Sequence, residues 1–141
     1  GVTFPHGCSM GFRRRTYLDV GGLDEHLRAG EEIDLALRLA ARSVRVHEVR
    51  DAIVHYRFRH DETQQWNQAF EGGRVKPHLC RSARRLGLAR PGRFDGLRNW
   101  LWLVRTWPRR HDPVVGRRRK WVLASRCGQL AGCWQHKTVY L

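Results

Sequence analysis

Two apolar periodicities divide the first part of the chain into short helices and strands. Residues 31–42 repeat apolar positions every three or four residues, which predicts an amphipathic helix, and a shorter helix is expected over residues 14–20. Three strands are also expected, over residues 8–12, 44–49 and 52–58. Arg50 and Asp51 would form the turn between the last two strands. Helices and strands in this order predict an α/β fold.

After His60 the pattern changes to helices that are punctuated by glycine and proline. Asp61, followed three residues later by Gln64, is a helix-start signal. Helix ends are expected at Gly72-Gly73, Pro77, Pro91-Gly92, Pro108 and Pro113. Apolar residues recur at helical spacing in two later segments, which are Phe94, Leu97, Leu101 and Val104, and Leu123, Cys127, Leu130 and Trp134. The sequence therefore predicts one domain over residues 1–60 and a helical extension over residues 61–141.

Basic charge is concentrated in the extension. Residues 1–60 carry 10 Lys+Arg against 8 Asp+Glu, whereas residues 61–141 carry 17 against 5. Arginine-rich amphipathic helices with tryptophans bind anionic membrane surfaces, and basic segments with aromatic residues also bind nucleic acid. No helix-turn-helix, zinc-finger or RNP-type signature accompanies the charge, which favours the membrane surface. No apolar run approaches the roughly 20 residues that span a bilayer.

The cysteines and the first residues say little about function. Four cysteines form no CxxC pair, and Cys127, Cys133 and His136 lack a fourth ligand at zinc-site spacing. Free thiols in a reducing compartment are therefore expected. The chain starts at Gly1 without the residue succession of a signal peptide, so we expect a parent protein with a further N-terminal part.

A glycine turn delivers three acidic residues onto the start of the helix over residues 31–42. A loop over residues 23–30 joins the turn at Gly21 and Gly22 to these acids, which are Glu31, Glu32 and Asp34. The free N–H groups and the helix dipole hold such carboxylates ionised, which is the state that a general base requires. The alternative is that these acids only stabilise the first helical turn. Arg38 lies four residues after Asp34, so an intrahelical ion pair is expected between them.

A second motif resembles the nucleophile elbow of hydrolases. Residues 7–11 read Gly-Cys-Ser-Met-Gly and match GxSxG, which exposes a serine at a strand-to-helix turn. Such an elbow needs a sheet and an oxyanion-hole loop before it, and only six residues precede Gly7. The motif therefore does not predict a hydrolase.

Several motifs, taken in order, resemble the C-terminal half of a family 2, GT-A-type glycosyltransferase. The family's Arg-Arg segment and GGFDE turn correspond to GCSMGFRRRTYLDVGGLDE, its acidic helix to GEEIDLALRL, and its strand pair ending in histidine to VRVHEVRDAIVHYRFR. This likeness covers residues 5–59, and two later helices are similar at QAFEG and CGQLAGCWQHKTVYL. The resemblance implies the C-terminal part of a GT-A nucleotide-diphospho-sugar transferase fold, followed by basic amphipathic helices.

The same resemblance implies inverting transfer of a sugar from a nucleotide-diphosphate donor to an acceptor hydroxyl. A carboxylate must take the hydroxyl proton while a divalent metal, Mg²⁺ or Mn²⁺, neutralises the departing diphosphate. Glu32 stands where the family has its base, with Glu31 as acidic neighbour, and Asp34 is the alternative because the family's usual base is Asp. His55 matches the histidine that completes the metal site in some members. Its alternative is a strand histidine bonded to the backbone.

Substrate-binding roles are implied by the matching motifs at Gly7, Ser9, Arg13, Asp24 and Gln68. Arg13 has the alternative of a solvated surface residue. The sequence contains no Asp-x-Asp, the family's metal and nucleotide motif, so the metal is expected to be held mainly by a missing donor half. This fragment alone is then expected to be inactive. No Gln-x-x-Arg-Trp follows near Trp66, which favours a non-processive enzyme.

The expected partners are a nucleotide-diphospho-sugar, a saccharide or lipid-linked acceptor, and an anionic membrane surface. These partners predict a role in polysaccharide or glycolipid biosynthesis, with the protein peripheral at the cytoplasmic face of the membrane. The alternative function is a basic nucleic-acid-binding module, which the +12 extension and its Arg117–Lys120 run would serve.

Overall fold

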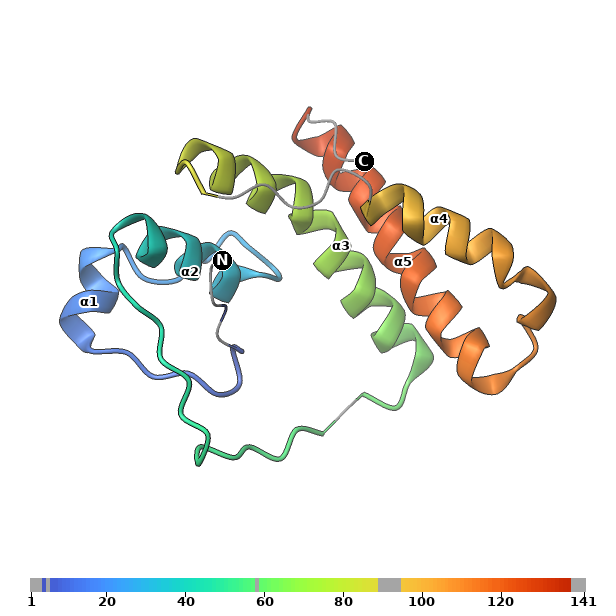
Figure 1. Ribbon diagram of the computed structural model, residues 1–141, viewed down its shortest axis with the longest axis horizontal. Coiled ribbons are helices and arrows are strands. Elements are labelled where there is room, and N and C mark those ends of the chain that lie inside the picture. The colour runs from blue at the N-terminus through green and yellow to red at the C-terminus, as the bar shows by residue number, and fades with distance from the viewer. Residues whose placement is uncertain (1–3, 5, 58, 89–94, 138–141) are drawn as a thin grey trace. The chain divides into compact units, whose positions relative to one another are not determined.

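The computed structural model describes residues 4, 6–57, 59–88 and 95–137, whose regular structure is entirely helical (Figure 1). The helices are α1 (Arg14–Asp19), α2 (Glu31–Ala41), α3 (Glu62–Arg85), α4 (Asp95–Arg105) and α5 (Pro113–Gln135), with a short 3₁₀ helix, η1 (Trp107–Arg109), after α4.

The chain divides into two compact units. The first contains residues 1–58 and 79–89, and the second contains residues 59–78 and 90–141.

The predicted α/β fold is wrong, because the described residues contain no strand and no sheet, and a GT-A fold requires one. Only an isolated bridge between His6 and Ser9 lies near the expected strand over residues 8–12. The turn at Arg50 and Asp51 does form, since the N–H of Ala52 donates to the carbonyl of Val49 at 3.1 Å. The flanking segments do not pair. A strand exists only when a neighbour satisfies its backbone groups, and periodicity alone does not supply that neighbour.

The first unit confirms both helices that were predicted there. Helix α2 begins after Gly30, which has a left-handed backbone (φ 75°), and buries Leu35 and Leu39 against Val20 at the end of α1. Phe12, Tyr17 and Leu23 pack around these three side chains. The core is small, and the extended segment that follows α2 leaves large apolar side chains such as Ile53 exposed at 78%.

Helix α3 begins as predicted but does not end where predicted. The carboxylate oxygens of Asp61 accept the N–H groups of Thr63 and Gln64, each at 3.2 Å. The helix then continues without a break through Gly72, Gly73 and Pro77 to Arg85. The expected ends at the glycine pair and at the proline are therefore wrong, and Pro77 lies fully buried inside the helix.

Glycine replaces side-chain packing where α3 meets α5 in the second unit. A Cβ at Gly73 would lie 2.8 Å from the carbonyl carbon of Ser125, and one at Gly128 would lie 2.8 Å from that of Phe70. One turn later, a Cβ at Gly132 would lie 2.9 Å from the carbonyl carbon of Arg74. Carbon atoms in ordinary contact are about 3.5–4.0 Å apart. The two helix backbones therefore touch at three points where no residue other than glycine fits.

The predicted apolar spacing of α4 and α5 is present, but its described residues are not buried. Phe94, the first residue of that spacing, lies outside the residues that the structure describes. Leu97, Leu101 and Val104 on α4 are more than half exposed, and Leu130 and Trp134 on α5 are also exposed. The sides that face other helices carry Leu103 on α4 and small or polar residues on α5, which are Ala124, Ser125, Arg126, Gly128, Gln129 and Gly132. Within the described residues, no helix is long and apolar enough to cross a membrane.

Candidate functional site

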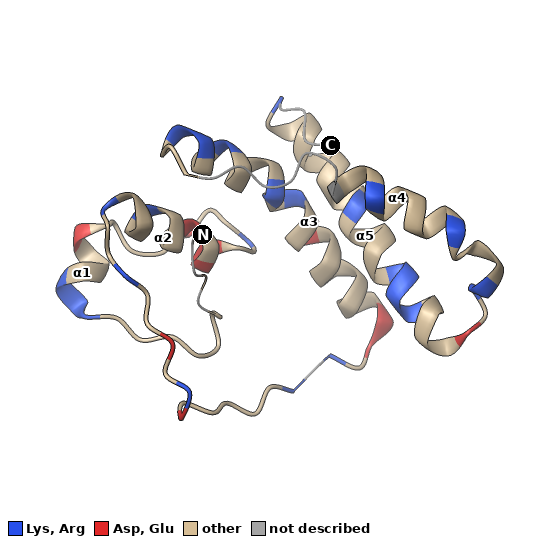
Figure 2. Ribbon diagram, viewed as in Figure 1, with Lys and Arg blue, Asp and Glu red and all other residues tan. Residues whose placement is uncertain are grey.

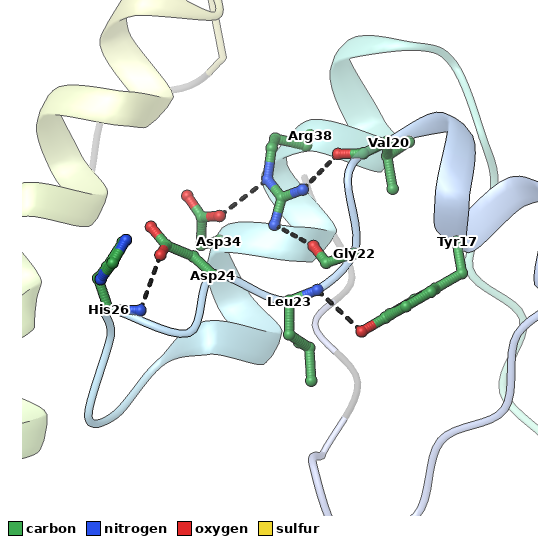
Figure 3. A network of polar contacts seen from close by, with 8 residues as sticks. All are labelled: Tyr17, Val20, Gly22, Leu23, Asp24, His26, Asp34 and Arg38. Atoms are coloured by element: carbon green, nitrogen blue, oxygen red, sulfur yellow. Dashed lines mark hydrogen bonds and ion pairs between the residues drawn. The ribbon is translucent and has the colours of Figure 1, made fainter.

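Arg38 binds the glycine turn to helix α2 (Figure 3). Its Nε donates to Asp34 Oδ2 at 2.8 Å, which confirms the expected intrahelical ion pair. Its Nη2 donates to the carbonyl of Gly22 at 2.7 Å, and its Nη1 donates to the carbonyl of Val20. Gly21 and Gly22 both have a left-handed backbone, with φ of 85° and 68°. One guanidinium therefore satisfies two turn carbonyls and one carboxylate at once.

Two further bonds shape the loop between the turn and the acidic residues. The Tyr17 hydroxyl accepts the N–H of Leu23 at 3.0 Å, and Asp24 Oδ1 accepts the N–H of His26 at 3.0 Å (Figure 3). Asp24, expected to bind substrate, thus caps a local turn with one carboxylate oxygen. Together with the Arg38 bond to Gly22, these bonds hold the first part of the loop, up to His26.

The three acidic residues at the start of α2 have different surroundings. Asp34 is 8% exposed and is held by Arg38. Glu31 is half-buried, and its Oε2 is buried without a hydrogen-bond partner among the described residues. Glu32 is half-buried and makes no hydrogen bond or ion pair with the part of the chain that the structure describes. Gly30 provides no side-chain cap, so the first N–H groups of α2, beside these acids, have no side-chain acceptor at the N-cap.

Within the described residues, His55 does not lie in a group of side chains that could hold a metal. His55 is exposed and lies in a segment without regular structure. No group of three or more His, Cys, Asp or Glu side chains that could hold a metal occurs among the residues that the structure describes. His78 and His136 are a pair in the second unit, with ring centroids 5.3 Å apart. A metal role for His55 stays a prediction.

The remaining expected substrate-binding residues are on the surface. Gly7 and Ser9 are exposed in a short turn, and no helix begins until Arg14, so residues 7–11 do not form a nucleophile elbow. Arg13 is the exposed residue before α1. Gln68 is exposed on α3, in the second unit. Of the sequence-predicted site residues, only Asp24, Glu31, Glu32 and Asp34 are gathered around one structural feature, the loop and start of α2.

A pocket with mixed chemistry lies in the second unit. A space of about 260 Å³ lies between the first turns of α3 and the N-terminal half of α5, lined by Glu62, Thr63, Gln65, Trp66, Arg117, Lys120 and Trp121. Lys120 Nζ and Glu62 Oε2 form an ion pair of 2.7 Å at its edge, where both side chains are more than half exposed. The pocket therefore offers indole surface together with hydrogen-bond donors and acceptors.

Arginine side chains lie over tryptophan rings in the second unit. The guanidinium of Arg118 lies 4.8 Å from the ring centroid of Trp102, and those of Arg110 and Arg119 lie 5.2 and 5.3 Å from that of Trp107. Arg119 also donates to Thr106 Oγ1 at 2.7 Å. The arginines therefore cover indole faces of Trp102 and Trp107, whereas the sequence led us to expect tryptophans that contact lipid or nucleic-acid bases.

Electrostatics at the start of α5 come from a capping aspartate. The N–H groups of Val115 and Val114 donate to Asp112 Oδ1, both at 2.9 Å, and lower the pKa of this exposed carboxyl below its ordinary value, with a smaller contribution from Arg109. This effect stabilises the ionised cap rather than any reacting group.

Two sets of side-chain bonds were not found from the sequence. The additional bonds of Arg38 to the turn carbonyls, and the Tyr17 bond to the loop, have no periodic signature. The signal that could have identified them is the Gly21-Gly22 pair, because a turn there leaves backbone carbonyls and N–H groups without helical partners, and nearby side chains must satisfy them.

Comparisons with known proteins gave no match, whether with family models, with curated proteins or with solved structures. The function of this chain must therefore be argued from its own residues.

Proposed function

We propose that the chain supplies the base for an inverting glycosyl transfer from a nucleotide-diphospho-sugar, and that Glu32 is that base. The observation that carries the proposal is the different state of the acids at the start of α2. Asp34 is buried and bound by Arg38, whereas Glu32 has no partner among the described residues. A base needs a lone pair that is free to accept a proton. Glu32 meets this requirement with both carboxylate oxygens, and it stands at the base position that the resemblance implies. Asp34 is the poorer base, because it is buried and Arg38 neutralises its charge. Glu31 also has an oxygen without a partner among the described residues, but that oxygen is buried.

The reaction is a single displacement. The acceptor hydroxyl oxygen attacks the anomeric carbon, the bond from that carbon to the diphosphate oxygen breaks, and the nucleoside diphosphate leaves with the electron pair. The hydroxyl proton passes to the carboxylate of Glu32. The loop that Arg38 and Tyr17 fix would set the angle at which the acceptor approaches this carboxylate, since small errors in position cost large factors in rate.

In this proposal the donor is held by other polypeptide, because the resemblance assigns donor binding to an Asp-x-Asp motif and the sequence contains none. A divalent ion, Mg²⁺ or Mn²⁺, bound mainly by that other polypeptide would neutralise the diphosphate. The acceptor is a saccharide or a lipid-linked saccharide. We include attachment at the cytoplasmic face of a membrane in this proposal, because a lipid-linked acceptor has to be reached at a bilayer surface.

The test is Glu32→Gln in a protein that combines this chain with a donor-binding segment. Loss of a general base lowers turnover by about 10²–10⁴-fold, while donor affinity stays nearly unchanged. Glu25→Gln is the matched control, because Glu25 is an exposed acid of the same loop region and should change turnover little. If Glu32→Gln keeps turnover within a few-fold of the parent, Glu32 is not the base.

A further inference from the structure

Helix α4 exposes a continuous row of large aliphatic side chains. Leu97, Leu101 and Val104 are 54%, 61% and 73% exposed, and their spacing of four and three residues places them on one face of the helix. We call these three residues the α4 stripe. Single exposed apolar residues are ordinary, but three in one row over two turns form a surface that water solvates poorly.

The opposite side of α4 is already used inside the second unit. Leu103 is 6% exposed, and Arg119 of α5 donates to its carbonyl and to Thr106 Oγ1 just beyond the helix. These contacts fix the rotation of α4 about its own axis. The α4 stripe is thus held away from α5 as a formed surface, and no folding of the helix is needed before it binds.

The charge of α4 and α5 indicates what kind of surface the stripe binds. Residues 95–137 carry ten Lys+Arg and two Asp+Glu, and Figure 2 shows basic segments recurring along α4 and α5. Arg98 and Arg105 lie on α4 itself, on a different face from the stripe. An apolar face with arginines beside it is the arrangement of a helix that lies in the interface of an anionic bilayer, where the guanidinium groups meet phosphates and the aliphatic groups enter the acyl region.

We propose that α4 docks on an anionic lipid bilayer through Leu97, Leu101 and Val104, with its arginines at headgroup depth. This inference rests on the membrane attachment in the proposed function and names the residues that make it, but it does not depend on Glu32, so its failure and the failure of the transfer proposal are distinguishable. A second copy of the chain is a poorer occupant, because two surfaces with the same excess of arginine repel each other. A nucleic acid would satisfy the arginines but offers little apolar surface to the stripe.

The structure also assigns the insertion at α4 to its aliphatic groups rather than to Trp102 and Trp107. Trp102 and Trp107 have arginines over their rings, at 4.8 Å for Arg118 and at 5.2 Å for Arg110. A stacked guanidinium binds lipid phosphate and keeps its indole at the interface. The tryptophans should therefore report binding through their emission without being the deepest groups.

The experiment is co-sedimentation of the full 141-residue chain with vesicles of phosphatidylcholine mixed with phosphatidylglycerol, against vesicles of phosphatidylcholine alone. Binding is expected to the mixed vesicles and to weaken as salt rises. Leu101→Glu should lower the affinity by about tenfold or more, because it removes buried apolar area and adds a charge facing the lipid. Val104→Glu should act in the same direction.

Ile53→Glu is the matched control. It adds the same charge at a position that is 78% exposed in the first unit, and it should change vesicle affinity by less than about threefold. Helix content, followed by far-ultraviolet circular dichroism, should be the same in all variants, because each replaced side chain is mostly exposed. The proposal is overturned if Leu101→Glu and Ile53→Glu weaken binding equally. It is also overturned if the chain does not bind anionic vesicles while it binds an oligonucleotide or associates with itself.

Discussion

Two adjacent glycines in α3 should respond to the same substitution with opposite signs. A Cβ at Gly72 would meet nothing within 4 Å, whereas a Cβ at Gly73 would lie 2.8 Å from the carbonyl carbon of Ser125 and 2.9 Å from its Cα. Both residues are in the interior of one helix and are neighbours in sequence. The pair therefore separates helix propensity from packing.

The magnitudes follow from these two surroundings. Replacing a helical glycine by alanine gains about 1 kcal/mol in helix propensity. Gly72→Ala should keep most of this gain. Gly73→Ala gains the same amount but must push α5 away, and overpacking of this kind costs about 1–3 kcal/mol. The cost should be near the upper end, because the opposing atoms belong to a helix backbone and cannot rotate aside. A net loss of about 2 kcal/mol is expected, which separates the two variants by about 3 kcal/mol.

Urea unfolding of the two variants, followed by circular dichroism, measures this difference. Gly128→Ala, on the facing side of the contact, should lose stability as Gly73→Ala does, because its Cβ would lie 3.0 Å from the backbone N of Arg74. Equal midpoints for Gly72→Ala and Gly73→Ala would refute the reasoning, since the helices would then not be in backbone contact.

Two further predictions concern charged groups. Arg38→Met should destabilise the first unit by about 2–4 kcal/mol in thermal unfolding, because it leaves the buried Asp34 unpaired and two turn carbonyls without donors. Arg42→Met is the control, and at its exposed position it should cost less than about 1 kcal/mol. The lowered pKa of Asp112 contributes stability that is present above the ordinary carboxyl pKa and is lost as pH falls through the lower folded value, so helix content of α5 should decline in that acid range. Asp112→Asn should flatten this part of the titration, and an unchanged acid transition would argue against the cap.

Local signals in the sequence were reliable where the structure depends on neighbouring residues. The periodicity of residues 31–42 gave α2 nearly to the residue, and Asp61 gave the start of α3, because caps and helical faces act within one or two turns. The Asp34–Arg38 pair was found for the same reason. The spacing also places the three carboxylates together at the start of α2, but it does not show that Glu32 lacks a partner among the described residues.

The errors concern partners that are distant in sequence. Residues 44–49 and 52–58 have the alternation of strands, but no described segment pairs with them, and alternation says nothing about a partner. Gly73 and Pro77 were interpreted as helix ends because they are weak helix formers, yet tertiary packing outweighs a propensity cost of about 1 kcal/mol for glycine. Likewise, helical spacing identified the apolar rows of α4 and α5 but did not show whether another helix covers them.

The backbone contact between α3 and α5 also constrains how this sequence can change by mutation. Every amino acid other than glycine carries a Cβ, so no single-base change at codons 73, 128 or 132 that alters the residue avoids the overlap. A conventional core position can move stepwise between isoleucine, leucine and valine while it keeps its volume. These three positions have no such intermediate steps. The contact can therefore be inherited unchanged or lost, and drift cannot repack it gradually.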